Sequence, residues 1–231
     1  MQNLRIVKDA LKAANPTFCV SGDIPIERLT LHFSPEEEST NPNAIRFPLD
    51  NPGAITPLIE ACKQAPFGAG QKAILDPEYR RALVLPGHRF AVAPATCVDP
   101  SALGILGQIQ RILLSGSANR IYACLDKLNV YGVGDFFKVH VDTPRSNKMF
   151  GTLLINLPVK HRGGNLVVHA PGQSSKSWPT SQEDGQISTN ANAESYITNW
   201  GDAEVMEWIA FFSDCPHEVL PVTQGNRSEI F

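Results

Sequence analysis

The stretch YGVGDFFKVHVDTPRSNKMFGTLLINLP, from Tyr131 to Pro158, decides the fold and contains the first candidate site residues. The β-branched and aromatic residues around His140 are typical of a β-strand, in which residues two apart point to the same face. We therefore expect the side chains of His140 and Asp142 to point together. Alone, this pair is a weak metal signal, because a buried histidine beside a carboxylate is a common structural feature.

A second stretch, DCPHEVLPVTQGNR, runs from Asp214 to Arg227 and also indicates a strand around its histidine. His217 would add a second imidazole to the His140 and Asp142 pair. Two imidazoles and one carboxylate on one face of a metal suit non-haem Fe(II) oxygen chemistry. Arg227 follows after a polar turn over 224–226, and its planar guanidinium can hold a carboxylate through two parallel hydrogen bonds.

These features resemble the Fe(II)- and 2-oxoglutarate-dependent dioxygenase superfamily, of the kind related to prolyl 4-hydroxylase. That superfamily carries a His-x-Asp, a distal histidine and a basic residue about ten positions after it. Short segments around the motif also match the superfamily, mainly in the C-terminal half. They are Gly134 to Phe137, Gly151 to Leu153, His161 to Gly164 and Phe211 to Cys215. Earlier, Phe18 to Gly22 and Asp76 to Ala82 are similar to the amino-terminal part of a hydroxylase-like subfamily.

The resemblance implies a reaction as well as a ligand set. His140, Asp142 and His217 would hold Fe(2+), and 2-oxoglutarate would bind the metal through its 1-carboxylate and 2-keto oxygen. Arg227 would hold the far carboxylate, and O2 would take the last coordination position. Succinate and CO2 would be released as a C–H bond of the substrate is hydroxylated, with ascorbate as a candidate reductant. The substrate is either a protein side chain such as prolyl or a small molecule.

Three further residues are candidate cosubstrate contacts. Tyr131 either helps to bind 2-oxoglutarate, as a tyrosine does in similar hydroxylases, or packs in the core. Thr152 and Asn156 share a strand face and either donate to a carboxylate or form structural cross-strand hydrogen bonds. The sequence departs from the superfamily after Arg227, where only Ser228 to Phe231 remain of a usually longer apolar strand. We therefore expect a less firm hold on Arg227.

The whole chain predicts an α+β fold: a double-stranded β-helix (jelly roll) core with supporting N-terminal helices, in one oxygenase domain over 1–231. Residues 1–119 are expected to be mostly helical support with flanking strands, and 120–231 to form the catalytic core. An apolar stripe predicts a helix over 4–14. Three more helices are expected to start at Thr56-Pro57, Asp76-Pro77 and Asp99-Pro100, the last reaching Ser115.

The composition limits the expected binding partners and the expected cellular location. A net charge of −3 gives no electrostatic reason to expect nucleic acid. No apolar run reaches the roughly 18 residues of a membrane span, and the charged N-terminus does not look like a secretory signal. We therefore expect no membrane association and an intracellular location, cytoplasmic or nuclear. The five scattered cysteines favour reduced thiols over a disulfide framework. The oligomeric state is left open.

Several alternatives stay open. The polar loop over 171–204 is either a substrate-facing lid or a passive insertion. His161 and His169 are rival ligands, although surface or hydrogen-bonded histidines are the commoner case. The same triad can serve a zinc-dependent hydrolase, which would leave Arg227 without a role. The domain can also be a catalytically weak or silent jelly-roll binding module.

Overall fold

The structure is a computed structural model of the 231-residue chain, and it describes residues 17–25, 28–37, 41–69, 72–171, 195–198, 201 and 205–231. The helix expected over 4–14 lies outside these residues. Most of the polar loop over 171–204 does too, so the choice between lid and insertion stays open.

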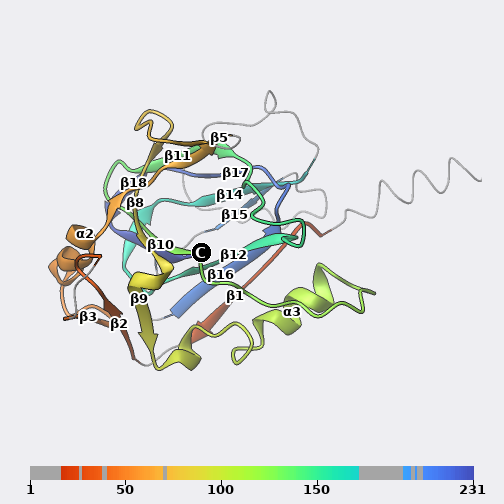
Figure 1. Ribbon diagram of the computed structural model, residues 1–231, viewed down its shortest axis with the longest axis horizontal. Coiled ribbons are helices and arrows are strands. Elements are labelled where there is room, and N and C mark those ends of the chain that lie inside the picture. Colours follow the sequence, from red (N-terminus) through yellow and green to blue (C-terminus); the bar gives the residue numbers. More distant parts are fainter. Residues whose placement is uncertain are drawn as a thin grey trace, which may run out of the picture.

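Two antiparallel sheets contain most of the described strands (Figure 1). The larger sheet has seven strands. In spatial order they are β1 (Cys19–Pro25), β16 (Val205–Phe212), β12 (Gly151–Asn156), β19 (Arg227–Ile230), β10 (Lys127–Tyr131), β8 (Leu83–Pro86) and β4 (Lys63–Gln64). The smaller sheet has five: β15 (Ser195–Ile197), β14 (Leu166–His169), β17 (His217–Val219), β11 (Phe136–His140) and β7 (Arg80–Arg81).

The C-terminal half alternates between the two sheets. β10, β12, β16 and β19 belong to the larger sheet, whereas β11, β14, β15 and β17 belong to the smaller one. Between them, β13 (His161–Gly163) pairs with β18 (Val222–Gly225). This alternation is consistent with the expected jelly-roll core, and it places residues from distant parts of the chain between two facing layers.

The amino-terminal region corrects the sequence-based expectation of mostly helical support. The described part of 1–119 is dominated by strands, including a three-stranded sheet of β3 (Asn43–Phe47), β2 (Leu29–Phe33) and β9 (Phe90–Ala93) and a hairpin of β5 (Phe67–Ala69) and β6 (Lys72–Ile74). Its α-helices are α2 (Thr56–Ala61) and α3 (Ile105–Ile112), with 3-10 turns η1 (Pro52–Ile55), η2 (Gly87–Arg89) and η3 (Ala95–Cys97).

Two of the three Pro-marked helix starts are wrong for the same local reason. The Asp76 side chain accepts a hydrogen bond from the Glu78 N–H, and the Asp99 side chain accepts one from Ser101. Such Asx turns compete with helix formation. After Asp76 the chain enters β7, and after Asp99 the helix begins only beyond Gly104, whose φ is 72°. The start at Thr56 is confirmed as the six-residue helix α2.

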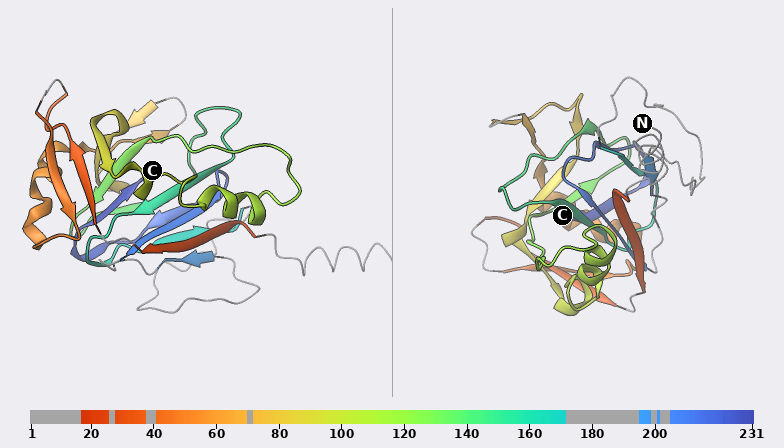
Figure 2. Two further views of the ribbon diagram at one scale, coloured as in Figure 1. Left: turned by 90° about the horizontal axis from the view of Figure 1, so that it is seen from below. Right: turned by 90° about the vertical axis from the view of Figure 1, so that its right-hand side faces the viewer.

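The larger sheet separates two hydrophobic clusters. β16 shows this most clearly, because Met206, Trp208 and Ala210 pack in the outer cluster, whereas Ile209 and Phe211 pack in the inner one. The three-stranded sheet, α2 and α3 contribute to the outer cluster. In the structure α3 lies away from α2 and the three-stranded sheet (Figures 1 and 2). The inner cluster lies between the two main sheets, where the candidate site is found. None of the described helices has the length and apolarity needed to cross a membrane.

Candidate metal centre and cosubstrate cavity

The two histidines of the expected triad come from neighbouring strands. β11 and β17 pair antiparallel, and His140 lies directly opposite His217 in their register. Residues opposite one another on such a pair have neighbouring side chains, and the two imidazole centroids are 4.1 Å apart. His217 is only 3% exposed. The sheet therefore brings together two imidazoles that are far apart in the sequence.

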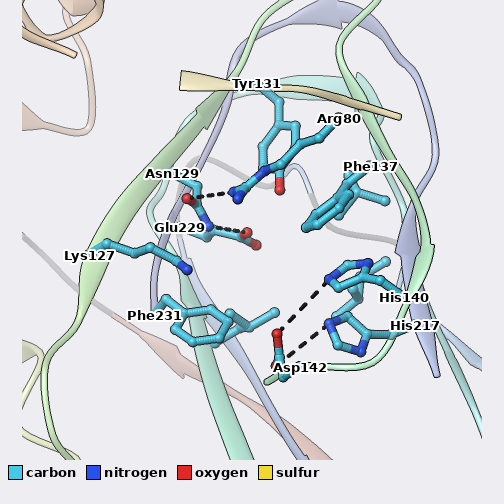
Figure 3. Close-up of a pocket in the computed structure, with 13 residues that line it drawn as sticks. Arg80, Lys127, Asn129, Tyr131, Phe137, His140, Asp142, His217, Glu229 and Phe231 are labelled. Carbon is cyan, nitrogen blue, oxygen red and sulfur yellow. Dashed lines mark hydrogen bonds and ion pairs between the residues drawn. The ribbon is translucent and has the colours of Figure 1, made fainter. Parts of the chain in front are cut away.

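Asp142 completes the triad from just beyond the end of β11. The expected strand through Asp142 is too long, since β11 ends at His140. The carboxylate nevertheless reaches both rings: Oδ1 is 4.0 Å from Nε2 of His140, and Oδ2 is 3.7 Å from Nε2 of His217 (Figure 3). Thr152 on β12 donates its hydroxyl to Oδ2 at 2.7 Å. This hydrogen bond from the opposite sheet fixes the carboxylate.

Both imidazoles present the same nitrogen to the site. Nδ1 of His140 lies 2.9 Å from the Lys138 carbonyl oxygen, and Nδ1 of His217 lies 3.0 Å from that of Cys215. A carbonyl oxygen only accepts, so each Nδ1 carries a proton and Nε2 is the nitrogen that faces Asp142. Burial, followed by the neighbouring His217, holds the pKa of His140 well below its usual value. His140 is therefore neutral and able to bind a metal at ordinary pH.

The arrangement fits an iron site. One ligand atom from each of His140, Asp142 and His217 lies within 4.8 Å of the others. The carbonyl partners of the two Nδ1 atoms and the Thr152 hydroxyl are the kind of outer contacts that orient metal ligands. Two imidazoles and one carboxylate on one side leave the other coordination positions open, which suits Fe(II).

A cavity extends from the triad into the space between the sheets (Figure 3). Its apolar wall includes Phe137, whose ring stacks on His140 at 3.5 Å between centroids. Its polar wall contains groups that the sequence reasoning did not select as site residues. They are Arg80, Lys127, Asn129 and Glu229. The segment from Asp76 to Ala82, noted for its resemblance to a hydroxylase-like subfamily, was the one sequence signal that pointed to Arg80. Lys127, Asn129 and Glu229 could be placed at the cavity only from the pairing of β10 with β19.

Tyr131 lines the same cavity and is 1% exposed. It lies opposite Arg227 in the pairing of β10 with β19. Burial, and after it the charge of Glu229, raises the pKa of the Tyr131 phenol to about 12. The phenol therefore remains protonated and can donate a hydrogen bond to an anion in the cavity.

Arg227 is fully buried on β19, and its NH2 is paired with the carboxylate of Glu229. Its guanidinium lies 5.2 Å from the Tyr131 ring centroid. Arg227 pairs with Tyr131 of β10, and β12 pairs with Glu229 and Ile230 further along β19. The expected weaker hold on Arg227 stays a prediction. The role of Arg227 as a carboxylate ligand stays a prediction.

The remaining candidates have structural partners. Asn156 is fully buried and donates to Glu207 at 3.3 Å, and these two residues lie opposite each other in the pairing of β12 with β16. Asn156 therefore forms a structural cross-strand hydrogen bond, the second of the two roles expected for it. His161 bonds the Val159 carbonyl, and His169 lies 3.6 Å from Glu218. Neither belongs to a group of potential metal ligands among the described residues. All five cysteines are free.

Comparison with known proteins supports the reading of the site. Residues 127–230 match the sequence model of the 2OG-Fe(II) oxygenase superfamily. This segment contains the triad, Tyr131 and Arg227. It is similar to the 2OG-Fe(II) oxygenase superfamily, and the match supports a 2-oxoglutarate-dependent iron dioxygenase that uses Fe(2+) and 2-oxoglutarate. No curated protein matches the sequence significantly.

Similar solved structures include three oxygenases. A prolyl-4-hydroxylase from Pseudomonas putida is 17% identical, covers 78% of this chain and 81% of its own, and gives a TM-score of 0.43. A 2OG-Fe(II) oxygenase family oxidoreductase from Burkholderia pseudomallei is 15% identical, with 73% and 70% covered and a TM-score of 0.40. A Trichoplax adhaerens prolyl hydroxylase, in complex with a hypoxia inducible factor peptide fragment, is 14% identical, with 99% and 90% covered and a TM-score of 0.43. These likenesses are too distant to assign a substrate.

Proposed function

We propose that the chain hydroxylates a C–H bond of a protein side chain, such as prolyl, or of a small molecule, with release of succinate and CO2. His140, Asp142 and His217 hold the iron in this proposal. The observation that carries it is the convergence of the three ligand atoms within 4.8 Å at the end of a cavity between the sheets. The bound iron and 2-oxoglutarate supply the oxidation of the C–H bond by O2.

The residues of the chain have separable tasks in this reaction. The backbone carbonyls of Lys138 and Cys215 hold both imidazoles with Nε2 toward the metal. Thr152 fixes the Asp142 carboxylate, and the Tyr131 hydroxyl offers a donor to the anionic cosubstrate. Leu154, Leu166 and Val219 line the cavity and limit the water that reaches the metal.

The test is succinate formation by the purified protein supplied with Fe(II), 2-oxoglutarate and O2, with ascorbate added to keep the iron reduced. We expect succinate even without the substrate, and none from Asp142→Ala, which should also lose metal binding. The matched control is Asp214→Ala, because Asp214 lies near β17 but outside the triad. Full succinate production by Asp142→Ala would contradict the proposal.

The same experiment separates the alternatives. A silent binding module would form no succinate under any metal. A zinc-dependent hydrolase would be reactivated after chelation by Zn(II) but not by Fe(II). The substrate is then sought by incubating the active enzyme with peptide and metabolite mixtures and scoring mass gains of one oxygen that require Asp142.

A further inference from the structure

A buried arginine from the amino-terminal region reaches the cavity. Arg80 lies on β7, before the matched residues 127–230, and is 4% exposed. β7 pairs antiparallel with β11 at the edge of the smaller sheet, and this register puts Arg80 directly opposite Phe137. Both side chains line the cavity together with the triad. The amino-terminal region therefore supplies one cation to the wall of the site.

Arg80, Phe137 and His140 contact one another in series along one side of the cavity (Figure 3). The guanidinium carbon lies 4.4 Å from the centre of the Phe137 ring, and that ring stacks on the imidazole at 3.5 Å between centroids, with 19° between the planes. Phe137 and His140 are three positions apart and would face opposite ways on a regular strand. The register of β11 with β17 shifts between them, so both side chains face the cavity.

This series of contacts restrains the metal ligand in a way that its hydrogen bond does not. The bond between Nδ1 of His140 and the Lys138 carbonyl selects the nitrogen that faces the metal, but it leaves the tilt of the ring about that bond free. A ring stacked on the imidazole limits this tilt. A buried cation is attracted to the face of an aromatic ring. Arg80 therefore holds Phe137 in the place from which it supports His140.

The same guanidinium fixes a hydroxyl in the cavity. NH1 of Arg80 donates to the Pro66 carbonyl at 2.6 Å, and NH2 donates to the Asn129 side-chain oxygen at 3.0 Å. The guanidinium is also hydrogen bonded to the side chain of Tyr131. Because a guanidinium only donates, the Tyr131 oxygen accepts from Arg80, and its own proton is available to another acceptor. Tyr131 lines the cavity, where that acceptor would be the anionic cosubstrate.

We propose that Arg80 is a positioning residue of the site. It holds Phe137 against the metal ligand His140, and it turns the Tyr131 hydroxyl toward the cosubstrate. The inference rests on the proposed function, and the expected role of Arg227 at the far carboxylate is unchanged. Arg80 acts on the metal only through Phe137 and on 2-oxoglutarate only through Tyr131. A lysine could not replace it, because an ammonium has neither the flat face nor the fork of donors.

The test measures two dissociation constants by calorimetry. One is that of Mn(II), and the other is that of 2-oxoglutarate on the Mn(II)-loaded protein, which binds without turnover. We expect Arg80→Gln to weaken each by about 3- to 10-fold, the range of one buried cation–ring contact or one hydrogen bond. Arg80→Lys keeps the buried charge and serves if Arg80→Gln does not fold. The same two losses are expected of it, and wild-type constants in Arg80→Lys would overturn the inference.

A double-mutant cycle separates positioning from a general effect on the fold. Tyr131→Phe removes the hydroxyl that Arg80 orients, so adding Arg80→Gln to Tyr131→Phe should change the 2-oxoglutarate affinity by less than about two-fold. The loss of Mn(II) affinity should persist in this background, because it passes through Phe137. A loss of 2-oxoglutarate affinity that is equally large with and without the hydroxyl would show a structural role and overturn the inference.

Arg81 offers the matched control. Its guanidinium lies 5.3 Å from the centre of the Phe136 ring on the same pair of strands, but Arg81 is exposed and does not line the cavity. We expect Arg81→Gln to keep both constants within about two-fold, as for an exposed charge. Equal losses in Arg81→Gln and Arg80→Gln would overturn the inference.

The wild-type titrations distinguish this inference from the function on which it rests. A wild type that binds no 2-oxoglutarate in the presence of Mn(II) would overturn the proposed function. A wild type that binds 2-oxoglutarate, with both constants unchanged in Arg80→Gln, would overturn only the positioning role of Arg80.

Discussion

Individual side chains in this molecule are fixed by partners that lie in the other sheet. Thr152 is the clearest case, since its hydroxyl on β12 holds a ligand that follows β11. The sequence left two partners open for Thr152: the carboxylate of the cosubstrate, or a structural cross-strand hydrogen bond. The partner is Asp142 of the protein itself, which changes the expected effect of a mutation from cosubstrate binding to metal binding.

We expect Thr152→Val to weaken Mn(II) binding by about 10- to 100-fold, the usual effect of losing an outer contact to a ligand. Valine keeps the shape and removes the hydrogen bond to Asp142. Calorimetric titration of Mn(II) measures the change, and Thr30→Val on β2, away from the triad, is the control. Equal affinity in Thr152→Val and wild type would show that Asp142 needs no such support.

His161 predicts a pH dependence of stability. It is 5% exposed, and burial, with a smaller contribution from Arg227, lowers its pKa to about 4 from an ordinary 6.5. The folded state therefore binds fewer protons than the unfolded state between these values. Its contribution to stability is complete above about pH 6.5 and is lost as the pH falls toward 4, up to about 3 kcal/mol.

Urea unfolding of the metal-free protein at pH 7.5 and pH 5 measures this effect. His140 also has a lowered pKa, so the comparison is between wild type and His161→Gln. We expect the variant to lose less stability than wild type over this pH range. An identical loss in both proteins would exclude His161 as a contributor.

At the scale of elements, strands were easier to anticipate than helices. β2 lies at its expected position, Leu29–Phe33, and the expected apolar strands of the C-terminal half appear as β10, β11, β12, β14, β16 and β17. The apolar residues and turn signals that mark these strands are local features, so they can be recognised in the sequence. The expected helix starts at Asp76 and Asp99 were wrong because the same residues that cap helices also make Asx turns, and only the following packing decides between the two.

Gly151 on β12 makes an element-scale prediction. A Cβ at this position would lie 2.5 Å from the Phe211 carbonyl oxygen on β16. Gly151→Ala must therefore push β12 from β16, and we expect a destabilisation of about 1–3 kcal/mol. Gly107 within α3 is the matched control, because nothing lies within 4 Å of its Cβ position.

The control should change in the opposite direction. Alanine is favoured over glycine in a helix, so Gly107→Ala should stabilise the protein by about 0.5–1 kcal/mol. Urea unfolding midpoints measure both variants. A stabilised Gly151→Ala would mean that the close contact between β12 and β16 is relieved without cost.

At the scale of the whole molecule, we expect a bound metal to stabilise the contact between the two sheets. In the smaller sheet His140 ends β11 and His217 begins β17, and Thr152 ties Asp142, which follows β11, to the larger sheet. A ligand that binds only the folded state stabilises it, by about 2.7 kcal/mol at one hundred times its dissociation constant. We expect Mn(II) to raise the unfolding temperature by several degrees and a chelator to reverse the rise.

Asp142→Ala provides the control for this measurement, because it should unfold at a temperature that Mn(II) does not change. Adding 2-oxoglutarate with Mn(II) should raise the wild-type temperature further. A rise of equal size in Asp142→Ala would place the stabilising metal elsewhere on the chain.

The sequence alone determined the candidate triad of His140, Asp142 and His217, most of the core strands and the resemblance to the superfamily, since residue types and their spacing are properties of the chain. The tertiary structure decided which charges meet. Arg227 faces Glu229 only because they lie on the same face of β19, and Arg80 enters the cavity only because β7 joins the edge of β11. Interaction between charges depends on distance and burial, and these exist only once the two sheets have closed on each other.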